Sequence, residues 1–490
     1  MTALGLLTGL LDAGTFRSWD TAQPGPATAD AGYATALARA RAATGAGESV
    51  ITGEGLLRGR RVAVAASEFG FLGGSVGLGA GERLTAAVER ATAERLPLVV
   101  LPASGGTRMQ EGTLAFLQMI KITAAVTAHK SAGLPYLVYL RHPTTGGVFA
   151  SWASLGHLTL AEPGALIGFL GPRVYEALAG RPFPDGVQTA ENLRAHGLVD
   201  AVLPPAELAA YLDGVLTAIT PAALEDTVTP RPAALTPGQA APSAWDSVLH
   251  TREPGRPGAS ELIGAMATGV VRLRETGLIL AFARAGAHPC VLVAQDRTGP
   301  TADVAALRLA RRGMRLAEEL RIPLVTVIDT PGAELSPQAE EEGLASEIAQ
   351  CIALMINLRT STVAVLLGEG TGGGALALLP ADRVLAAQHA WLAPLAPEGA
   401  SAIVYKDTVH APEVAARQRI QSADLASDGI VDRVVPETDA LCRDLGRAVH
   451  DELRFLTRQD EAARMTARLR RYRSLGRARG GPPAGSIMGW

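Results

Sequence analysis

Residues 197–204 read GLVDAVLP and residues 429–436 read GIVDRVVP, two nearly identical phrases far apart in one chain. Each phrase closes a stretch in which short runs of valine and leucine alternate with segments of helical spacing. Short apolar runs without polar alternation are typical of strands that are buried on both faces of a parallel sheet. The repeated ending therefore predicts two similar α/β halves.

The same landmarks precede the two phrases in the same order in both halves. A proline opens a buried strand at Pro97 and again at Pro323, and glycine pairs begin at Gly146 and Gly373. Pro97 lies 49 residues before Gly146, and Pro323 lies 50 residues before Gly373. This shared order predicts an internal duplication in which right-handed crossovers join the strands of each half.

The composition fits a globular protein and excludes several other classes. Of the 490 residues, 48% are hydrophobic and 19% are charged, which excludes a chain disordered throughout. A net charge of −3 and an aromatic content of 4% argue against a nucleic-acid partner. We find no long uncharged apolar run that would cross a membrane, and residues 1–17 read as a short helix rather than a signal peptide.

Three widely spaced cysteines, Cys290, Cys351 and Cys442, suggest buried reduced thiols in a cytoplasmic protein rather than a disulfide framework. The length predicts two to four domains, and a proline-rich stretch separates the two halves. We expect an N-terminal domain at residues 1–225, a linker at 226–257, a C-terminal domain at 258–460 and an arginine-rich helical tail at 461–490.

Glycine is unusually frequent, with 54 among 490 residues against about 7% in average proteins. A glycine pair after a strand can simply form a tight turn that needs positive φ. It can also present backbone N–H groups to an oxygen that gains negative charge during a reaction. Because pairs recur at matching places in both halves, we interpret them as two oxyanion sites serving two carbonyl oxygens.

Motifs of several common catalytic and nucleotide-binding sites do not occur in the sequence. The glycine-rich stretch 368–374 lacks the Gly-Lys-Ser/Thr ending of a P-loop, no nucleophile elbow is found, and no HExxH pair occurs. Glu111 and the run 340–342 read as solvated acids at helix starts. With no convincing nucleophile or general base, stabilisation of oxyanions by the backbone is the main candidate.

Several segments of the first half resemble the β subunit of bacterial acetyl-CoA carboxylase carboxyltransferase. They are FGFLGGS (69–75), SGGTRMQE (104–111), PTTGGV (143–148), AEP (161–163) and IGFLGPRV (167–174). The second half resembles the α subunit, through IDTPGA (328–333), GEGTGGGALA (368–377) and APEG (396–399). The chain thus resembles a β–α fusion in one polypeptide.

The resemblance implies two crotonase-like domains, each a spiral of ββα units. It implies transfer of CO₂ from carboxybiotin to the α-carbon of an acyl-CoA, most simply acetyl-CoA to malonyl-CoA, a step of fatty acid biosynthesis. The biotin would be carried by a separate biotin carboxyl carrier protein and loaded by a biotin carboxylase. A homodimer or higher homo-oligomer is implied as well, because the two domain types of this family usually meet across a dimer.

The same resemblance assigns roles to individual residues. Gly146 and Gly147 would hold the enolate oxygen of the thioester, and Gly373 and Gly374 would hold the ureido oxygen of biotin, whose freed N1 would take the substrate proton. The coenzyme A side would be lined by Gly73, Gly74, Gly105, Gly106 and Arg108. Arg108 would meet a phosphate or form a structural ion pair. The biotin side would also include Gly332, Ala333 and Gly372.

The sequence departs from the family pattern in three places. The four-cysteine zinc ribbon of the β subunit is absent, so no metal is expected, Thr107 stands where the family has alanine, and the stretch 295–304 is shorter than in the α subunit. These differences leave the acyl group open. Two other functions remain: a biotin-independent malonyl-thioester decarboxylase, and a catalytically silent partner of another carboxylase.

Overall fold

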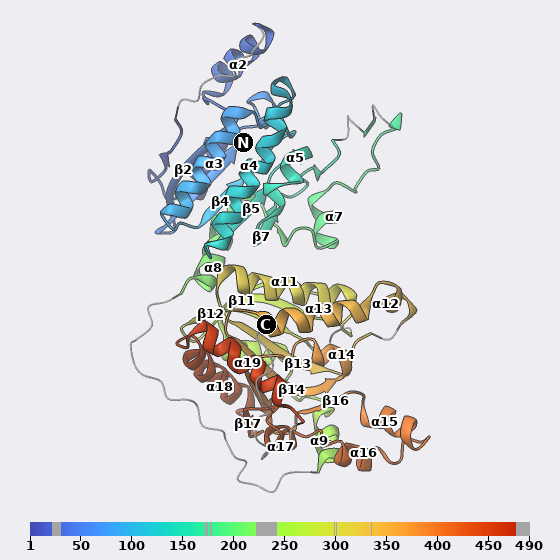
Figure 1. The fold of residues 1–490 in the computed structure, drawn as a ribbon. Coiled ribbons are helices and arrows are strands. Elements are labelled where there is room, and N and C mark those ends of the chain that lie inside the picture. The colour runs from blue at the N-terminus through green and yellow to red at the C-terminus, as the bar shows by residue number, and fades with distance from the viewer. Residues whose placement is uncertain are drawn as a thin grey trace, which may run out of the picture. The chain divides into compact units, whose positions relative to one another are not determined.

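The computed structural model describes residues 1–490 apart from 22–30, 172–174, 177–178, 222–242, 298, 300, 335 and 477–490. The chain divides into two compact units, Met1–Thr217 and Ala218–Trp490, and each unit has a large sheet of its own (Figure 1). The prediction of two similar α/β halves is therefore confirmed.

The first unit contains a seven-stranded sheet in the order β1-β2-β3-β4-β5-β7-β9. β1 to β3 pair antiparallel, and the remaining neighbours pair parallel. The strands of this sheet are β1 (Arg17–Ser18), β2 (Val50–Leu57), β3 (Arg60–Ser67), β4 (Leu98–Leu101), β5 (Tyr136–Leu140), β7 (Leu158–Ala161) and β9 (Ala201–Val202). Two short strands, β6 (Thr144–Thr145) and β8 (Ile167–Gly168), pair with each other beyond its edge.

The helices of the first unit bury an apolar core against this sheet. They are α1 (Ala3–Leu10), α2 (Ala31–Thr44), α3 (Leu78–Ala93), α4 (Gly112–Ser131), α5 (Gly146–Phe149), α7 (Ala190–Ala195) and α8 (Pro205–Ile219). α3 and α4 pack side by side, with Leu84 and Ile122 in one core cluster with Val100 and Val138 of the sheet. Burial of such side chains contributes about 1.5–3 kcal/mol each.

The second unit repeats this plan with an eight-stranded sheet in the order β10-β11-β12-β13-β14-β15-β17, with β16 paired to β14. β10, β11 and β12 pair antiparallel and the later neighbours pair parallel. The strands are β10 (Thr268–Glu275), β11 (Ile279–Ala285), β12 (His288–Ala294), β13 (Leu324–Thr330), β14 (Thr362–Thr371), β15 (Arg383–Ala387), β16 (Trp391–Ala393) and β17 (Arg433–Val435).

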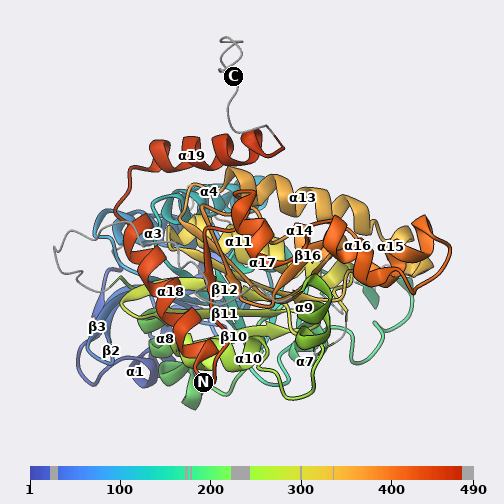
Figure 2. The ribbon, with the colours of Figure 1, turned by 90° about the horizontal axis from the view of Figure 1, so that it is seen from below.

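In the second unit, α11 and α13 pack side by side, α18 packs on β14, β15 and β17, and α19 contacts α13 (Figure 2). The helices are α9 (Ala244–Thr251), α10 (Ala259–Met266), α11 (Val304–Leu320), α12 (Pro337–Glu341), α13 (Leu344–Asn357), α14 (Gly372–Leu376), α15 (Pro397–Val404), α16 (Ala411–Arg417), α17 (Ser422–Ser427), α18 (Leu441–Leu456) and α19 (Glu461–Ser474). Residues 226–242 of the expected linker and 477–490 of the expected tail lie outside the described residues, whereas 243–257 include α9.

The repeated phrase near the end of each half has the same structural role in both units. The Asp200 carboxylate accepts the Thr159 N–H of β7 at 2.8 Å, and the Asp432 carboxylate accepts the Val384 N–H of β15 at 2.8 Å. Each aspartate therefore ties the last strand of its sheet to the neighbouring strand. A charged acceptor at this place satisfies a backbone donor that the strand pairing leaves open.

A buried carboxylate, Asp382, fastens α19 to the second sheet. It accepts two bonds of 2.7–2.8 Å from Arg468, and it also accepts the Thr362 N–H at 2.9 Å. The Arg468 side chain is fully buried and that of Asp382 is 2% exposed. Removing one charge from such a pair leaves the other uncompensated in the interior.

Asp382→Asn should therefore lower the free energy of unfolding by about 3–5 kcal/mol, measured by urea denaturation followed by circular dichroism. Asp444→Asn is the matched control, because Asp444 forms an exposed i,i+3 ion pair with Arg447 on α18. It should change stability little. Equal stability changes in the two variants would show that the buried pair does not hold α19.

The three cysteines are free, but Cys442 is only partly buried, whereas the sequence suggested three buried thiols. Cys290 and Cys351 are free and buried, and burial raises the pKa of both thiols to about 12, so they stay protonated. In the part of the chain that the structure describes, no three His, Cys, Asp or Glu side chains gather as metal ligands. Nor does any helix there have the length and apolarity to cross a membrane.

Candidate active site

In the first unit the loop that follows β4 is held in a fixed conformation. The Ser104 hydroxyl accepts the Gly106 N–H at 3.0 Å, and the Gly106 carbonyl accepts the Val76 N–H at 2.9 Å. The Arg108 N–H donates back to the Val76 carbonyl at 2.9 Å. The segment 104–108, called the first oxyanion loop below, is thereby bound to residue 76 on both sides of Thr107.

This loop faces the N-terminus of α5. A Cβ added to Gly106 would lie 3.6 Å from the Gly147 nitrogen, and one added to Gly146 would lie 3.4 Å from the Gly105 carbonyl oxygen. Gly146 has φ +64°, a conformation that L side chains rarely adopt. The two backbones therefore come together with no side chain between them.

The two glycines of the first pair differ in what their N–H groups do. The Gly146 N–H donates to the Phe169 carbonyl at 3.1 Å, so it is already used. Gly147 is the second residue of α5, where the N–H has no partner within the helix. Among the described residues we find no acceptor for the Gly147 N–H, which is thus available to a ligand.

Of the glycines predicted for the coenzyme A side, Gly105 and Gly106 belong to the first oxyanion loop, and Gly73 and Gly74 contact it. The Gly105 N–H donates to the Gly73 carbonyl at 2.9 Å. Gly74 has φ +63°, and a Cβ there would lie only 2.0 Å from the Ala103 carbonyl oxygen. Gly74 thus lets the chain pass close to the residues that begin the loop.

The second unit contains the same arrangement. The Thr330 hydroxyl accepts the Gly332 N–H at 3.2 Å, as Ser104 does for Gly106, and the Glu334 N–H donates to the Ala302 carbonyl at 3.0 Å, as Arg108 does to Val76. This second oxyanion loop, 330–334, contains the predicted Gly332 and Ala333. A Cβ on Gly374 would lie 3.2 Å from the Ala333 nitrogen, so α14 starts against the loop.

In the structure Gly146 of the first half corresponds to Gly372 of the second half, one residue before the expected Gly373. α14 begins at Gly372, whose φ of +61° matches that of Gly146, so Gly373 corresponds to Gly147. Pro323 lies 49 residues before Gly372, the same spacing as in the first half. The run of three glycines conceals this register, and the sequence-based pairing of Gly146 with Gly373 was wrong by one position.

Unsatisfied polar atoms surround the second oxyanion loop. Gln295 Nε2 donates to the Gly374 carbonyl at 2.8 Å, while its Oε1, Asp329 Oδ2 and Thr371 Oγ1 are buried without a hydrogen-bond partner among the described residues. Burial raises the pKa of Asp329 to about 6, opposed by Arg297 at 3.8 Å. Unpaired buried polar atoms of this kind are rare in native structures.

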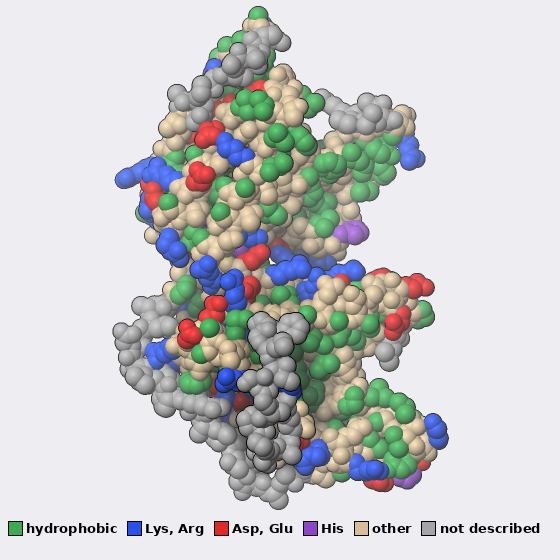
Figure 3. Space-filling view, in the orientation of Figure 1, with side chains coloured by type: hydrophobic (Ala, Val, Ile, Leu, Met, Phe, Trp, Pro, Cys, Tyr) green, Lys and Arg blue, Asp and Glu red, His purple; other side chains and the backbone are tan. Residues whose placement is uncertain are grey.

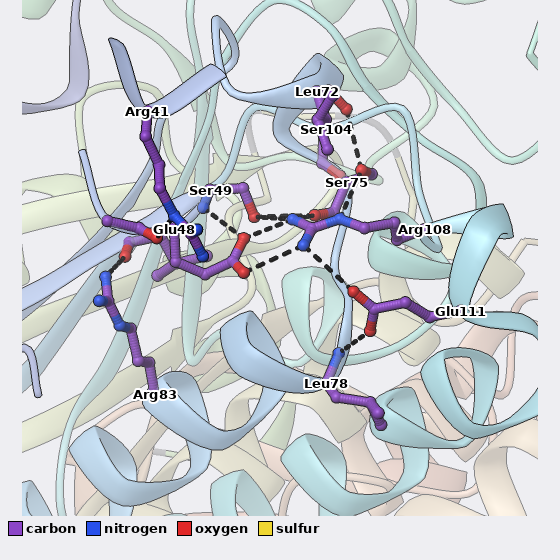
Figure 4. A network of polar contacts seen from close by, with 12 residues as sticks. Arg41, Glu48, Ser49, Leu72, Ser75, Leu78, Arg83, Ser104, Arg108 and Glu111 are labelled. Atoms are coloured by element: carbon purple, nitrogen blue, oxygen red, sulfur yellow. Dashed lines mark hydrogen bonds and ion pairs between the residues drawn. The ribbon is translucent and has the colours of Figure 1, made fainter. Parts of the chain in front are cut away.

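Arg108, expected at a phosphate or in an ion pair, lies fully buried in an ion pair (Figure 4). Its guanidinium contacts Glu48 and Glu111, so it does not reach a phosphate in solvent. Glu111, which the sequence suggested to be solvated, has a side chain only 2% exposed. The reason is that Tyr33 and the Leu78 N–H also donate to it.

Sequence reasoning missed Glu48 and Tyr33 altogether. Glu48 lies 60 residues from Arg108 and Tyr33 lies 78 residues from Glu111, with no motif at either position. The only local signal was the i,i+3 spacing of Arg108 and Glu111, which is compatible with an ion pair on one turn.

Comparisons with known proteins cover both units. A model described as "Carboxyl transferase domain" matches residues 8–211, and one described as "Acetyl co-enzyme A carboxylase carboxyltransferase-like" matches residues 240–476. The chain is 57% identical over 485 residues to a "Probable biotin-dependent acyl-coenzyme A carboxylase beta3 subunit" of Mycobacterium tuberculosis, covering 95% of this chain and 97% of that protein.

Two further relatives extend the comparison. An "Acetyl-coenzyme A carboxylase carboxyl transferase subunits beta/alpha" protein of Salinispora arenicola is 39% identical over 487 residues, covering 93% of this chain and 86% of that one. The solved transcarboxylase 12S superposes with a TM-score of 0.76 at 21% identity, covering 99% and 92% of the two chains. This structural likeness confirms the predicted crotonase-like fold with two similar domains.

Proposed function

The chain belongs to the carboxyltransferase family of biotin-dependent acyl-CoA carboxylases, with a β-type half and an α-type half in one polypeptide. We propose that the two halves divide the reaction between them. The first unit stabilises the enolate of the acyl-CoA, and the second unit binds the biotin. The observation that carries the proposal is the pair of matching glycine-lined backbone cradles, one in each unit.

In the first unit the donors are backbone groups. The open Gly147 N–H stands at the start of α5, where the Gly147 nitrogen lies beside Gly106 of the first oxyanion loop. Gly146 does not donate to the substrate but sets the conformation that exposes Gly147. A single donor of this kind contributes about 3 kcal/mol to the stability of the transition state.

In the second unit the start of α14 and the second oxyanion loop would hold the biotin ring. Carboxybiotin, delivered by a separate carrier protein, supplies the CO₂ and is left with negative charge on its ureido oxygen. Gly373 would face that oxygen, and Gly332 and Gly374 place no side chain in the cradle beside Ala333. Gln295 supports the cradle from behind by donating to the Gly374 carbonyl at 2.8 Å.

We also propose a homo-oligomer that binds a biotin carboxyl carrier protein loaded by a biotin carboxylase. The support is an apolar surface on η2 (Met109–Glu111) and α4, seen over α4 in Figure 3. Its members are more than two-fifths exposed: Met109, Leu114, Phe116, Leu117 and Ile120. A contiguous apolar patch of this kind is typical of a contact with another protein surface.

The side chains near Gly146 indicate the length of the acyl group that the first unit accepts. Acetyl-CoA to malonyl-CoA is the simplest reaction, but Phe169 and Leu170, which are 62% and 40% exposed, follow the strand that contacts the start of α5. Apolar side chains beside the enolate site would accept an acyl chain longer than acetyl. The relative of 57% identity is named for an acyl group of unspecified length.

The reverse reaction tests this proposal with the full-length protein. Malonyl-CoA and methylmalonyl-CoA, each with and without free biotin, should lose their carboxyl group only when biotin is present. A higher kcat/KM for methylmalonyl-CoA would favour the longer acyl group. Loss of CO₂ without biotin would indicate a decarboxylase, and no loss with any donor would indicate a silent partner.

A further inference from the structure

We propose that Arg108 is a positioning residue, whose ion pair with Glu48 holds the first oxyanion loop in register with Gly147. The inference rests on the proposed function of that loop and adds the side chains that support it. Because the Arg108 guanidinium is fully buried, we assign it to a buried clamp rather than to a phosphate contact. The clamp is defined as Arg108, Glu48, Ser49 and Ser75 (Figure 4).

Every edge of the Arg108 guanidinium is used inside the protein. Nη1 donates to Glu48 at 3.0 Å, and Nη2 donates to the Ser49 hydroxyl at 3.0 Å and to the Ser75 carbonyl at 2.7 Å. Nε approaches the Ser75 hydroxyl at 3.3 Å. A planar fork with this many partners fixes both position and orientation, which a lysine ammonium does not reproduce.

The clamp acts on the oxyanion loop through a short path. The Arg108 side chain binds the Ser75 carbonyl, while its backbone N–H binds the next carbonyl, that of Val76. Val76 in turn donates its N–H to Gly106, whose Cα stands against Gly146. A shift of Arg108 therefore moves the Gly106 backbone directly, and shifts of about 1 Å in a catalytic arrangement can cost about 100-fold in rate.

A second set of contacts joins α2 and α3 to the clamp. Glu111 approaches Arg108 at 3.4 Å and accepts hydrogen bonds from the Tyr33 hydroxyl on α2 and from the Leu78 N–H at the start of α3. Burial raises the pKa of Tyr33 to about 12, so that it remains a donor at neutral pH. The loop is thus tied to two helices.

The clamp belongs to the acyl side alone. The residue that takes the place of Arg108 in the second oxyanion loop is Glu334, as the matching Val76 and Ala302 contacts show. A glutamate has no donors with which to repeat the fork. Loss of the clamp is therefore expected to disturb the enolate site and leave the biotin cradle in place.

The test compares Arg108→Lys and Glu48→Gln with Arg83→Lys in the reverse assay. Arg83 is the matched control because it is also buried in an ion pair in this unit. It binds the Asp20 carboxylate and the Val50 and Thr21 carbonyls rather than the loop. We expect kcat to fall about 10- to 100-fold in both clamp variants, with the KM for malonyl-CoA changed less than about threefold. The control should stay within about twofold of the wild type.

Hydrogen–deuterium exchange over residues 104–112 gives a readout that does not depend on activity. Exchange should be faster in both clamp variants and unchanged in the control. A raised KM with an unchanged kcat would make Arg108 a substrate ligand. A lower melting temperature with no change in kcat or in exchange would make it purely structural. Either result overturns the proposal. A wild type without activity would refute the proposed function, while the exchange data would still decide the clamp.

Discussion

Gly146→Val is expected to reduce biotin-dependent decarboxylation of malonyl-CoA by about 1,000-fold in kcat. Valine at φ +64° is strained, and its Cβ would lie 3.4 Å from the Gly105 carbonyl oxygen and the Gly106 Cα. The start of α5 must then move away from the first oxyanion loop, and the Gly147 N–H moves with it. The rate of acetyl-CoA formation under saturating biotin measures the effect.

Gly59→Val controls for backbone strain outside the site. Gly59 has φ +82° in the turn between β2 and β3, and nothing lies within 4 Å of an added Cβ. The control should lose stability but keep kcat within about threefold at a temperature where it is folded. Comparable activity in Gly146→Val and the wild type would remove Gly146 from the enolate site.

Gly372→Val should cause a loss of similar size in the second unit, but by a different route. Gly372 has φ +61°, and its Cβ would approach the Pro394 carbonyl oxygen at 3.3 Å, so α14 would be displaced from the second oxyanion loop. Since this unit is assigned to biotin, binding of malonyl-CoA measured by calorimetry should stay within about twofold. The kcat should fall about 100- to 1,000-fold.

Gly269→Val is the corresponding control, because Gly269 has φ +58° at the start of β10 with open space around it. It should retain activity when folded. If Gly372→Val instead weakens binding of malonyl-CoA and leaves the KM for biotin unchanged, the assignment of the two units would be reversed.

The fold could be predicted because both halves contain the same local sequence patterns in the same order. The phrases around Asp200 and Asp432 are alike, and in both of them the carboxylate accepts a hydrogen bond from a strand N–H. The glycines could be found for a similar reason, since close backbone approach and positive φ leave no choice of residue at Gly74 or Gly146. Backbone requirements of this kind leave a visible trace in one sequence.

The side chains that support the site could not be predicted in the same way. Glu48 and Tyr33 meet Arg108 and Glu111 only after the chain has folded, and a buried ion pair across many residues has no periodic signature. The one-residue shift at Gly372 was hidden for another reason, because three consecutive glycines give three equivalent places at which α14 could begin. Only the helix start and the φ values decide between them.

The fate of the carboxyl group distinguishes transfer to biotin from simple decarboxylation. Labelled malonyl-CoA would be incubated with free biotin and the full-length protein, quenched in base and examined for N-carboxybiotin by mass spectrometry. If the two units stabilise the two oxyanions of one transfer, the C–C bond breaks, CO₂ passes to the biotin nitrogen and the displaced proton goes to the α-carbon. Carboxybiotin and acetyl-CoA should then form in equal amounts. Labelled CO₂ released without carboxybiotin would contradict the account.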